Sequence, residues 1–328
     1  MSETTQIIKP VILKITENII KKYPYIRKDF EFFYNVRIRS NKLLLRPYLA
    51  RVIYELSGRS DWQKHKELFA LIEVLNISTY QSNLAFDNKN GITSELSKNN
   101  QFISSIFSNF SIINEVLSNK RYSKKIKHQI IEEISKSIEK TYYGQFIDIN
   151  VLNFSETSCL YNEKKFKNIY EKRCYYLGGG LIRLCASIPI ILLKPTINNI
   201  EDELYNFSDV FGIAGQILND IGDFKSGGET YSLNQFSDIN NERLTFPIRE
   251  LAILDKRNPI SKRKLMQLAL DDDTLNMLID KVDNLLNSYR KNVFRIIQQI
   301  DKSNYNVQNL LLIANILKKS CFLERIEK

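Results

Sequence analysis

The sequence predicts a single all-α domain that spans residues 1–328. Apolar residues recur at intervals of three and four along most of the chain, which is the spacing of one helix face. Glycine and proline number only 11 and 7, which argues against a turn-rich all-β fold. No alternating run of strand length, fixed repeat or linker interrupts this pattern. With 43% hydrophobic residues, we expect a helical bundle with a sizeable core.

Helices are expected wherever the apolar periodicity is sustained. Arg46 and Pro47 lie near the start of the second helix, where proline is favoured. Residues 177–193 are strongly apolar but contain Arg183 and Pro189, so we expect a buried core helix and no transmembrane segment. The expected helices are residues 7–22, 43–56, 66–85, 102–117, 125–142, 166–193, 204–224, 244–254, 262–270, 274–299 and 306–322. The polar segments 87–100, 150–163 and 225–242 are expected loops, and the last is a candidate lid.

Composition excludes several classes of function. The net charge of +10 is spread over many helices without a basic block interleaved with aromatic residues, which argues against nucleic-acid binding. It fits an anionic substrate or an anionic lipid surface equally well. Four cysteines lack metal-ligand spacing, and two histidines make a histidine metal site improbable. The N-terminus has no sustained apolar segment of a signal peptide. We therefore expect a cytoplasmic protein with reduced thiols.

The most informative segment is GQILNDIGD, residues 215–223, inside an apolar helical run. Asn219 and Asp223 are four residues apart and share a helix face, and Asp220 flanks them. Oxygen donors in this arrangement can hold Mg²⁺, which binds carboxylates, water and substrate phosphates. A solvated acidic turn near a helix end is the alternative.

Five separated segments place this motif in a larger pattern. They are Arg46-Pro47 after NKLLL at 41–45, EVLN at 73–76 leading into NLAFD at 83–87, GQFID at 144–148, YEKR at 170–173, and the acidic motif followed by Asp238 and RLTFP at 243–247. In order and spacing they resemble the trans-isoprenyl diphosphate synthase (polyprenyl synthetase) family. That resemblance implies a helical bundle of the class I isoprenoid synthase type with a central apolar tunnel. It also implies a homodimer, or a heterodimer with an active synthase.

In that family two acidic motifs on facing helices hold Mg²⁺ ions, which bind the diphosphate of an allylic substrate. Here the first motif is eroded, because Asn83 and Leu84 stand where the family has aspartates, and Asp87 remains. The second motif keeps two of its three carboxylates. The resemblance therefore implies that the metal ligands are Asn83, Asp87, Asn219, Asp220 and Asp223.

The basic residues of the family's diphosphate site are partly replaced. Arg173 and Arg243 stand at two lysine positions and keep the charge, although structural ion pairs are the alternative for each. The expected diphosphate-binding residues are Arg173, Arg243, Arg46, Lys42 and Gln216, and the expected catalytic residues are Asp220, Asp223, Arg173 and Arg243. On the side that holds isopentenyl diphosphate, only Arg46 survives, with Leu43 and Asn76 at other family positions.

Small residues precede the first motif. Ser78 and Thr79 occupy the positions that form the tunnel floor in the family, which favours a deep tunnel unless Tyr80 blocks it. Phe86 and Phe211 could stabilise a carbocation through their ring faces, with core packing as the commoner role.

Three functions fit this pattern. The preferred one is a Mg²⁺-dependent, terpene synthase-like enzyme that ionises one prenyl diphosphate without chain elongation. The second is a divergent prenyltransferase, and the third is a noncatalytic subunit that pairs with an active synthase.

Overall fold

The computed structural model describes residues 3–28, 30, 38, 44–86, 98–194, 196–224, 236–255 and 260–318. Every regular element within these ranges is helical, apart from one isolated antiparallel bridge between Asn153 and Arg243. The predicted all-α helical bundle is thus confirmed.

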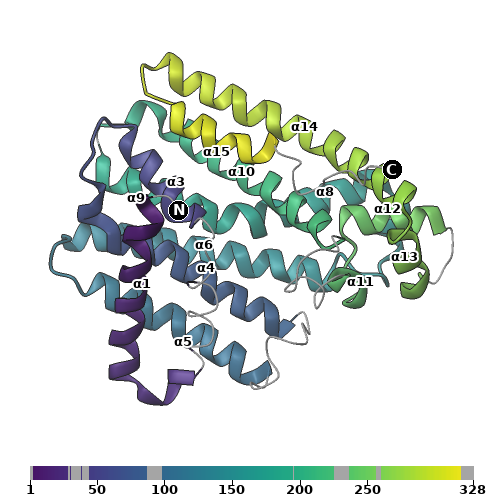
Figure 1. Cartoon of the computed structure of the whole chain (residues 1–328), viewed down its shortest axis with the longest axis horizontal. Coiled ribbons are helices and arrows are strands. Elements are labelled where there is room, and N and C mark those ends of the chain that lie inside the picture. Colours follow the sequence, from purple (N-terminus) through teal and green to yellow (C-terminus); the bar gives the residue numbers. More distant parts are fainter. Residues whose placement is uncertain are drawn as a thin grey trace.

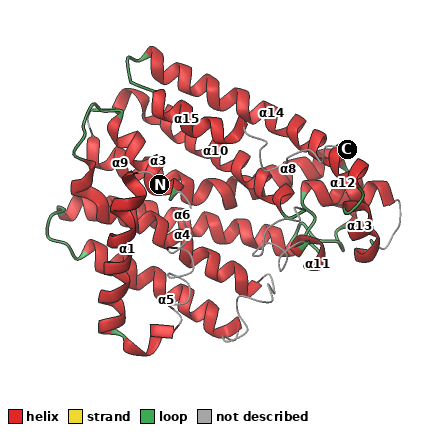
Figure 2. Cartoon of the chain, viewed as in Figure 1, coloured by secondary structure: helices red, strands yellow, loops and turns green. Residues whose placement is uncertain are grey.

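The long helices lie side by side in layers (Figure 1, Figure 2). α14 packs on α10, α10 on α9, and α9 on α3, α4 and α6, while α5 packs on the other side of α4. α1 crosses this stack and covers α3, α4 and α5. The bounds are α1 Glu3–Lys22, α3 Leu45–Glu55, α4 Lys66–Phe86, α5 Lys98–Leu117, α6 Lys124–Asn150, α7 Thr157–Tyr161, α8 Glu163–Cys174, α9 Gly180–Leu193, α10 Glu201–Gly222, α11 Ser237–Asn240, α12 Phe246–Asp255, α13 Lys262–Ala269, α14 Asp272–Lys302 and α15 Gln308–Lys318.

The central helix is α9, which packs against α3, α4, α6 and α10 and buries nearly its whole length. The segment Glu163–Leu193 is the one described helical stretch that is long and apolar enough to cross a membrane. However, 67% of its most apolar window is buried inside the fold, as in a core helix. This agrees with the interpretation of residues 177–193 as a core helix.

Glycines bring α10 into backbone contact with the segment that joins α8 to α9. That segment, Tyr175–Gly179, is a single π-helical turn. A Cβ atom built on Gly178 would lie 2.1 Å from the carbonyl oxygen of Gly212 on α10, so only glycine fits there. The contact holds the C-terminal end of α8 beside α10.

Two short helices occupy segments that were predicted as loops. α7 lies within residues 150–163, and α11 lies within 225–242. The backbone N–H groups of Ser237 and Asp238 donate to the Asp223 carboxylate, so a distant side chain caps α11. Residues 225–235 of the expected lid lie outside the described ranges.

Candidate active site

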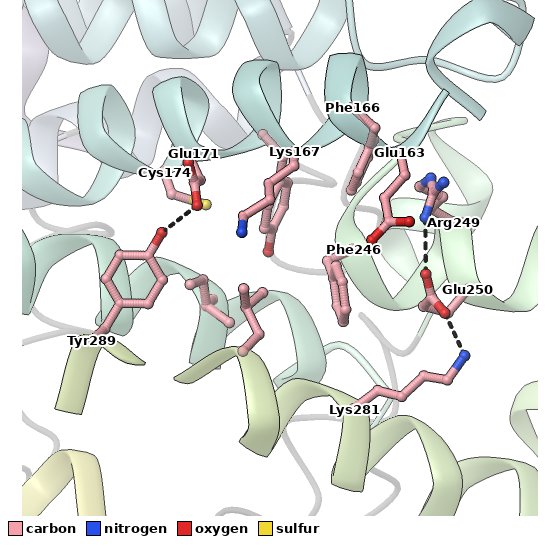
Figure 3. Close-up of a pocket in the computed structure, with 13 residues that line it drawn as sticks. Glu163, Phe166, Lys167, Glu171, Cys174, Phe246, Arg249, Glu250, Lys281 and Tyr289 are labelled. Atoms are coloured by element: carbon pink, nitrogen blue, oxygen red, sulfur yellow. Dashed lines mark hydrogen bonds and ion pairs between the residues drawn. The ribbon is translucent and has the colours of Figure 1, made fainter. Parts of the chain in front are cut away.

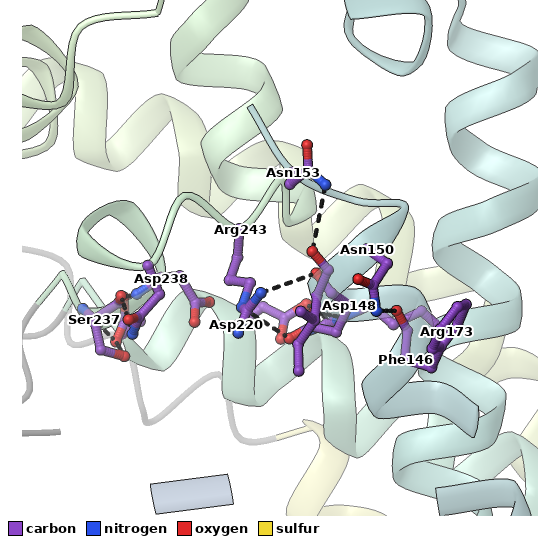
Figure 4. A network of polar contacts seen from close by, with 12 residues as sticks. Phe146, Asp148, Asn150, Asn153, Arg173, Asp220, Ser237, Asp238 and Arg243 are labelled. Atoms are coloured by element: carbon purple, nitrogen blue, oxygen red, sulfur yellow. Dashed lines mark hydrogen bonds and ion pairs between the residues drawn. The ribbon is translucent and has the colours of Figure 1, made fainter. Parts of the chain in front are cut away.

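A buried guanidinium, that of Arg173, lies at the centre of a polar network between α6, α8 and α10 (Figure 4). Its Nε donates to the carboxylate of Asp148, and its Nη1 donates to Asp220 Oδ2 at 2.6 Å. Arg173 is 3% exposed and Asp220 is fully buried. One cation therefore neutralises two carboxylates that the fold removes from water.

Both oxygens of the Asp220 carboxylate accept hydrogen bonds. Besides Arg173, the hydroxyl of Tyr170 donates to Oδ2 at 2.7 Å, and the amide of Gln216 donates to Oδ1 at 3.0 Å. Burial raises the pKa of the Asp220 carboxyl, and Arg173 and Tyr170 oppose that shift. Burial and the charge of Asp220 together raise the pKa of Tyr170, which keeps its hydroxyl a donor. These three donors hold Asp220 in one orientation.

Arg243 supplies a second buried guanidinium. Its backbone N–H donates to the carbonyl of Asp238 at 2.9 Å, and its Nε lies 3.5 Å from Asp148 Oδ2. Asp148 therefore lies between Arg173 and Arg243, which are both buried. Both arginines form the internal ion pairs that the sequence left open, and a role for either on a diphosphate stays a prediction.

Two carboxylates neighbour each other where α10 meets α11. Asp223 accepts hydrogen bonds from the hydroxyl of Ser237 at 2.7 Å and from the backbone N–H of Asp238 at 3.0 Å. Burial raises the pKa of the half-buried Asp238 carboxyl well above its ordinary value, and Asp223, Asp220 and Asp148 raise it further. Among the described residues, four carboxyl groups thus share two guanidinium groups, and the neighbouring carboxylates disfavour ionisation of Asp238.

Arg46 lies apart from this network, in the first turn of α3. It is half-buried, and its Nε is shielded from solvent without a hydrogen-bond partner among the described residues. On α4, the amide of Asn76 donates to Glu73 at 3.4 Å. Burial raises the pKa of the Cys185 thiol on α9 to about 12, and Arg46 lowers it while Glu73 raises it. The charges of Arg46 and Glu73 therefore act on the same part of α9.

Several predicted ligands lie outside the described ranges. Lys42 and Asp87 belong to this group, and the side chain of Phe86 is likewise not described. Asn83 is half-buried on α4, and Asn219 is exposed on α10. Within the described chain, no three Asp, Glu, His or Cys side chains converge as a metal site.

The predicted tunnel residues that are described all contact the core. Ser78 and Thr79 are buried, and the hydroxyl of Ser78 donates to the carbonyl of Ser105 on α5 at 2.9 Å. Tyr80 is half-buried against the core. Phe211 stacks at 5.7 Å on the phenylalanine one turn earlier. These are contacts of core residues, and a tunnel lined by them stays a prediction.

Sequence reasoning did not name three members of the network as site residues. Asp148, Tyr170 and Asp238 all lie in segments that carry the family resemblance. Asp148 ends the G-Q-x-x-D motif, Tyr170 lies three residues before Arg173, and Asp238 lies five before Arg243. Their fixed spacing from the motif residues could have indicated that they belong to the site.

Comparison with known proteins identifies the family of the chain. Residues 97–284, more than half of the chain, match the sequence model described as polyprenyl synthetase. The chain belongs to the polyprenyl synthetase family. Membership of this family implies an enzyme that uses a prenyl diphosphate, and the family uses a divalent metal. All six residues of the network's charged groups lie within the matched range. A search of curated protein sequences finds no significant match.

Solved structures of prenyl synthases share the polyprenyl synthetase fold over nearly the whole chain. Geranylgeranyl pyrophosphate synthetase from Geoglobus acetivorans is 18% identical with a TM-score of 0.64, and 97% of this chain and 99% of that chain are covered. Heptaprenyl diphosphate synthase from Staphylococcus aureus is 15% identical with a TM-score of 0.68, and 97% of this chain and 98% of that chain are covered. Polyprenyl synthase from Caulobacter crescentus CB15, complexed with calcium and isoprenyl diphosphate, is 12% identical with a TM-score of 0.67, covering 97% and 98%. At these identities the likeness concerns the fold.

Proposed function

We propose that this protein is a Mg²⁺-dependent prenyltransferase that ionises an allylic prenyl diphosphate beside the acidic network and joins it to an acceptor. The observation that carries the proposal is the gathering of four carboxyl groups around two guanidinium groups among the described residues, where the carboxylates raise the pKa of Asp238. The C-terminal ends of α6 and α10, at Asn150 and Gly222, add the negative ends of two helix dipoles. Such a site favours added cations.

The donor set suits Mg²⁺, which takes few protein carboxylates and completes its coordination with water and substrate phosphates. Asp223 and Asp238 would hold the ion together with Asn219, and Asn83 and Asp87 would contribute from the first motif. When bound, Mg²⁺ supplies charge stabilisation for the departing diphosphate. Asp220 was also predicted as a ligand. Its carboxylate is fully buried and is bound by Arg173, which supports a positioning role, whereas Asp223 is half-buried and accepts three hydrogen bonds from neutral donors.

The arginines in this proposal act on the carboxylates first. Arg173 and Arg243 flank the Asp148 carboxylate, and Arg173 orients Asp220, in a region that excludes water. If either guanidinium also contacts the diphosphate, it does so through N–H groups that do not take part in these ion pairs. The amide of Gln216, also expected on the diphosphate, donates to Asp220, and its role on the diphosphate stays a prediction.

Arg46 supports prenyl transfer over simple ionisation. A half-buried guanidinium whose Nε has no hydrogen-bond partner in the described part of the chain is suited to an anionic second substrate such as isopentenyl diphosphate. The terpene synthase-like reaction, which needs no such substrate, is the second candidate. It is favoured by Glu73, whose negative charge acts on the same part of α9 as Arg46 and reduces the attraction for a diphosphate.

A product assay distinguishes these candidates. Purified protein with Mg²⁺ receives ten-, fifteen- or twenty-carbon allylic diphosphates, each with and without isopentenyl diphosphate. Prenyl transfer predicts a longer diphosphate that forms only with isopentenyl diphosphate and is lost in Arg46→Gln. A hydrocarbon or alcohol formed without isopentenyl diphosphate would establish the terpene synthase-like reaction. No product in any reaction would favour a noncatalytic subunit that needs an active partner.

We also propose a cytoplasmic homodimer. The support is an exposed apolar row on α5, where Ile103 is 63%, Ile106 38% and Phe110 67% exposed. Apolar side chains grouped in this way on a helix mark a surface for association. A heterodimer with an active synthase would use the same surface.

A further inference from the structure

One stretch of the chain is an exception to the even spread of positive charge. Residues 21–28, called the basic segment below, read KKYPYIRK, with four cations, two tyrosines and no acid. They run from the last two residues of α1 across the 3₁₀ helix Pro24–Ile26. Figure 1 shows this end of α1 at the lower edge of the molecule, away from α11 and the acidic network.

The cations of the basic segment are exposed. Lys21, Lys22 and Lys28 form no ion pair with any described residue. The Nζ of Lys22 lies 5.4 Å from the centre of the Tyr23 ring, a contact that leaves its charge in place. Three ammonium groups at one edge of the molecule are therefore open to an anionic partner.

Acids near the basic segment offset only part of its charge. Glu17 is exposed one turn before Lys21 on α1, and Glu115 on α5 lines the same groove as Lys22. The Glu115 carboxylate accepts a hydrogen bond from Asn18 at 2.8 Å. Among the described residues here, two acids stand beside four cations, so this edge keeps a positive excess.

Cations that hold the bundle together have an acidic partner. Arg249 and Lys281 line a cavity between α8, α10, α12 and α14, and both pair with the carboxylate of Glu250 (Figure 3). The lysines of the basic segment make no such pair within the described chain. Cohesion of the fold therefore does not explain why they gather at this edge.

Tyr25 is the apolar element of the basic segment. Its side chain is 101% exposed, so nothing in the described fold buries its ring. Pro24 precedes it and restricts the backbone of the 3₁₀ helix that carries the ring. A tyrosine ring has an apolar body and a polar tip, and such rings favour the interface between lipid and water. Cations around an exposed ring of this kind are typical of a surface that binds anionic lipid.

We propose that the basic segment attaches the protein to the surface of a membrane that contains anionic lipids. The lysines lie against the headgroups, and the ring of Tyr25 enters the interface. The attachment is peripheral, and the apolar row on α5 stays available for association between copies. The inference does not depend on the proposed prenyl transfer.

The tyrosines favour a membrane over nucleic acid as the partner. Binding of single-stranded nucleic acid uses several rings on which successive bases stack. Tyr25 is free, but Tyr23 packs edge-on against Phe107, with ring centroids 5.1 Å apart. One free ring suits insertion into lipid better than stacking along a strand.

Co-sedimentation of the full chain with unilamellar vesicles tests the proposal. Vesicles of phosphatidylcholine are compared with vesicles that contain one third phosphatidylglycerol. We expect binding to the anionic vesicles to be tighter by at least about tenfold. Lys21→Gln/Lys22→Gln should weaken that binding about 25-fold, because each cation near such a surface contributes roughly a factor of five. The control Lys124→Gln/Lys125→Gln removes the same charge from the exposed start of α6 and should change it less than about twofold.

A salt series separates the ring from the charges. Tyr25→Ser should weaken binding to anionic vesicles about fivefold at every salt concentration, because it removes apolar contact. Lys21→Gln/Lys22→Gln should instead reduce the dependence on salt. Tyr161→Ser, at another exposed tyrosine, should behave as the wild type.

Three results would overturn the proposal. The first is equal binding to neutral and anionic vesicles, or binding to neither. The second is an equal loss in Lys21→Gln/Lys22→Gln and Lys124→Gln/Lys125→Gln, which would show that net charge alone matters. The third is binding of a single-stranded oligonucleotide, lost in Lys21→Gln/Lys22→Gln, by a protein that does not bind anionic vesicles, which would assign the basic segment to nucleic acid.

Discussion

Arg173 joins side chains that are distant in the chain, because Asp148 lies 25 residues before it and Asp220 lies 47 residues after it. All three are buried, so Asp220 depends on the guanidinium for compensation of its charge, and Asp148 depends on it together with Arg243. Breaking a buried pair by removing one partner is far more costly than losing a surface pair, since the remaining charge stays desolvated.

We therefore expect Arg173→Gln to lower the free energy of unfolding by about 3–5 kcal/mol. Urea denaturation followed by circular dichroism measures this. The neighbouring exposed Lys172→Gln is the matched control, with an expected change within about 0.5 kcal/mol. A loss below about 1 kcal/mol in Arg173→Gln would show that the buried carboxylates do not depend on this cation.

His65 makes stability depend on pH. The centroid of its ring lies 5.5 Å from that of Tyr54, and its Nδ1 is 3.3 Å from the hydroxyl of Tyr122. Burial lowers the pKa of His65, and Asp61 opposes the shift. Below the ordinary histidine pKa of about 6.5, the unfolded chain therefore binds a proton more readily than the folded protein. Stability consequently falls as pH drops from that value towards the lower folded pKa.

The prediction is a larger loss of unfolding free energy between about pH 7.5 and about pH 5.5 in the wild type than in His65→Gln. Denaturant titrations at each pH measure it. The chain has one other histidine, the exposed His128, and His128→Gln should behave as the wild type. Equal pH slopes in the wild type and His65→Gln would contradict the assignment.

At the scale of elements, the contact of α10 with the π-helical turn Tyr175–Gly179 places the network. A Cβ atom on Gly212 would lie 2.6 Å from the carbonyl oxygen of Gly178, and neither backbone can move without displacing its helix. Gly215 lies on the same helix, and a Cβ there would meet nothing within 4 Å. The two positions therefore form a matched pair.

We expect Gly212→Ala to lower the free energy of unfolding by about 1–3 kcal/mol through overpacking. Gly215→Ala should raise it by about 0.5–1 kcal/mol, because alanine restricts the unfolded chain and favours a helix. Chemical denaturation of both variants tests this. If Gly212→Ala were as stable as Gly215→Ala, the two backbones would not be in contact.

The helices that the sequence predicts are stabilised differently from those that it does not predict. The long helices follow from apolar periodicity, which records burial of one face directly in the sequence. α11 has four residues and depends on Asp223 for its cap, so no local pattern reveals it. The ion pairs of Arg173 were equally hidden, because the sequence shows a charge but not the burial of its partners.

At the scale of the whole molecule, the bundle gathers the acidic network where helices end. Asp148 is in the last turn of α6 and Asp220 is in the last turn of α10, so helix dipoles add to their negative charge. Asp238 and Asp223 extend this region at α11. Two internal arginines offset only part of the negative charge of these carboxylates. In the proposed function, bound Mg²⁺ offsets the rest.

Release of inorganic diphosphate tests that claim most directly. The assay offers ten-, fifteen- and twenty-carbon allylic diphosphates with isopentenyl diphosphate, with Mg²⁺ or with EDTA. We predict release that requires Mg²⁺ and falls by about 100-fold in Asp238→Asn. The melting temperature of that variant should not fall, since the change removes an acid whose ionised form burial and the neighbouring carboxylates disfavour. Asp202→Asn, exposed at the start of α10, should match the wild type. Release that persists in EDTA, or that is unchanged in Asp238→Asn, would contradict the account.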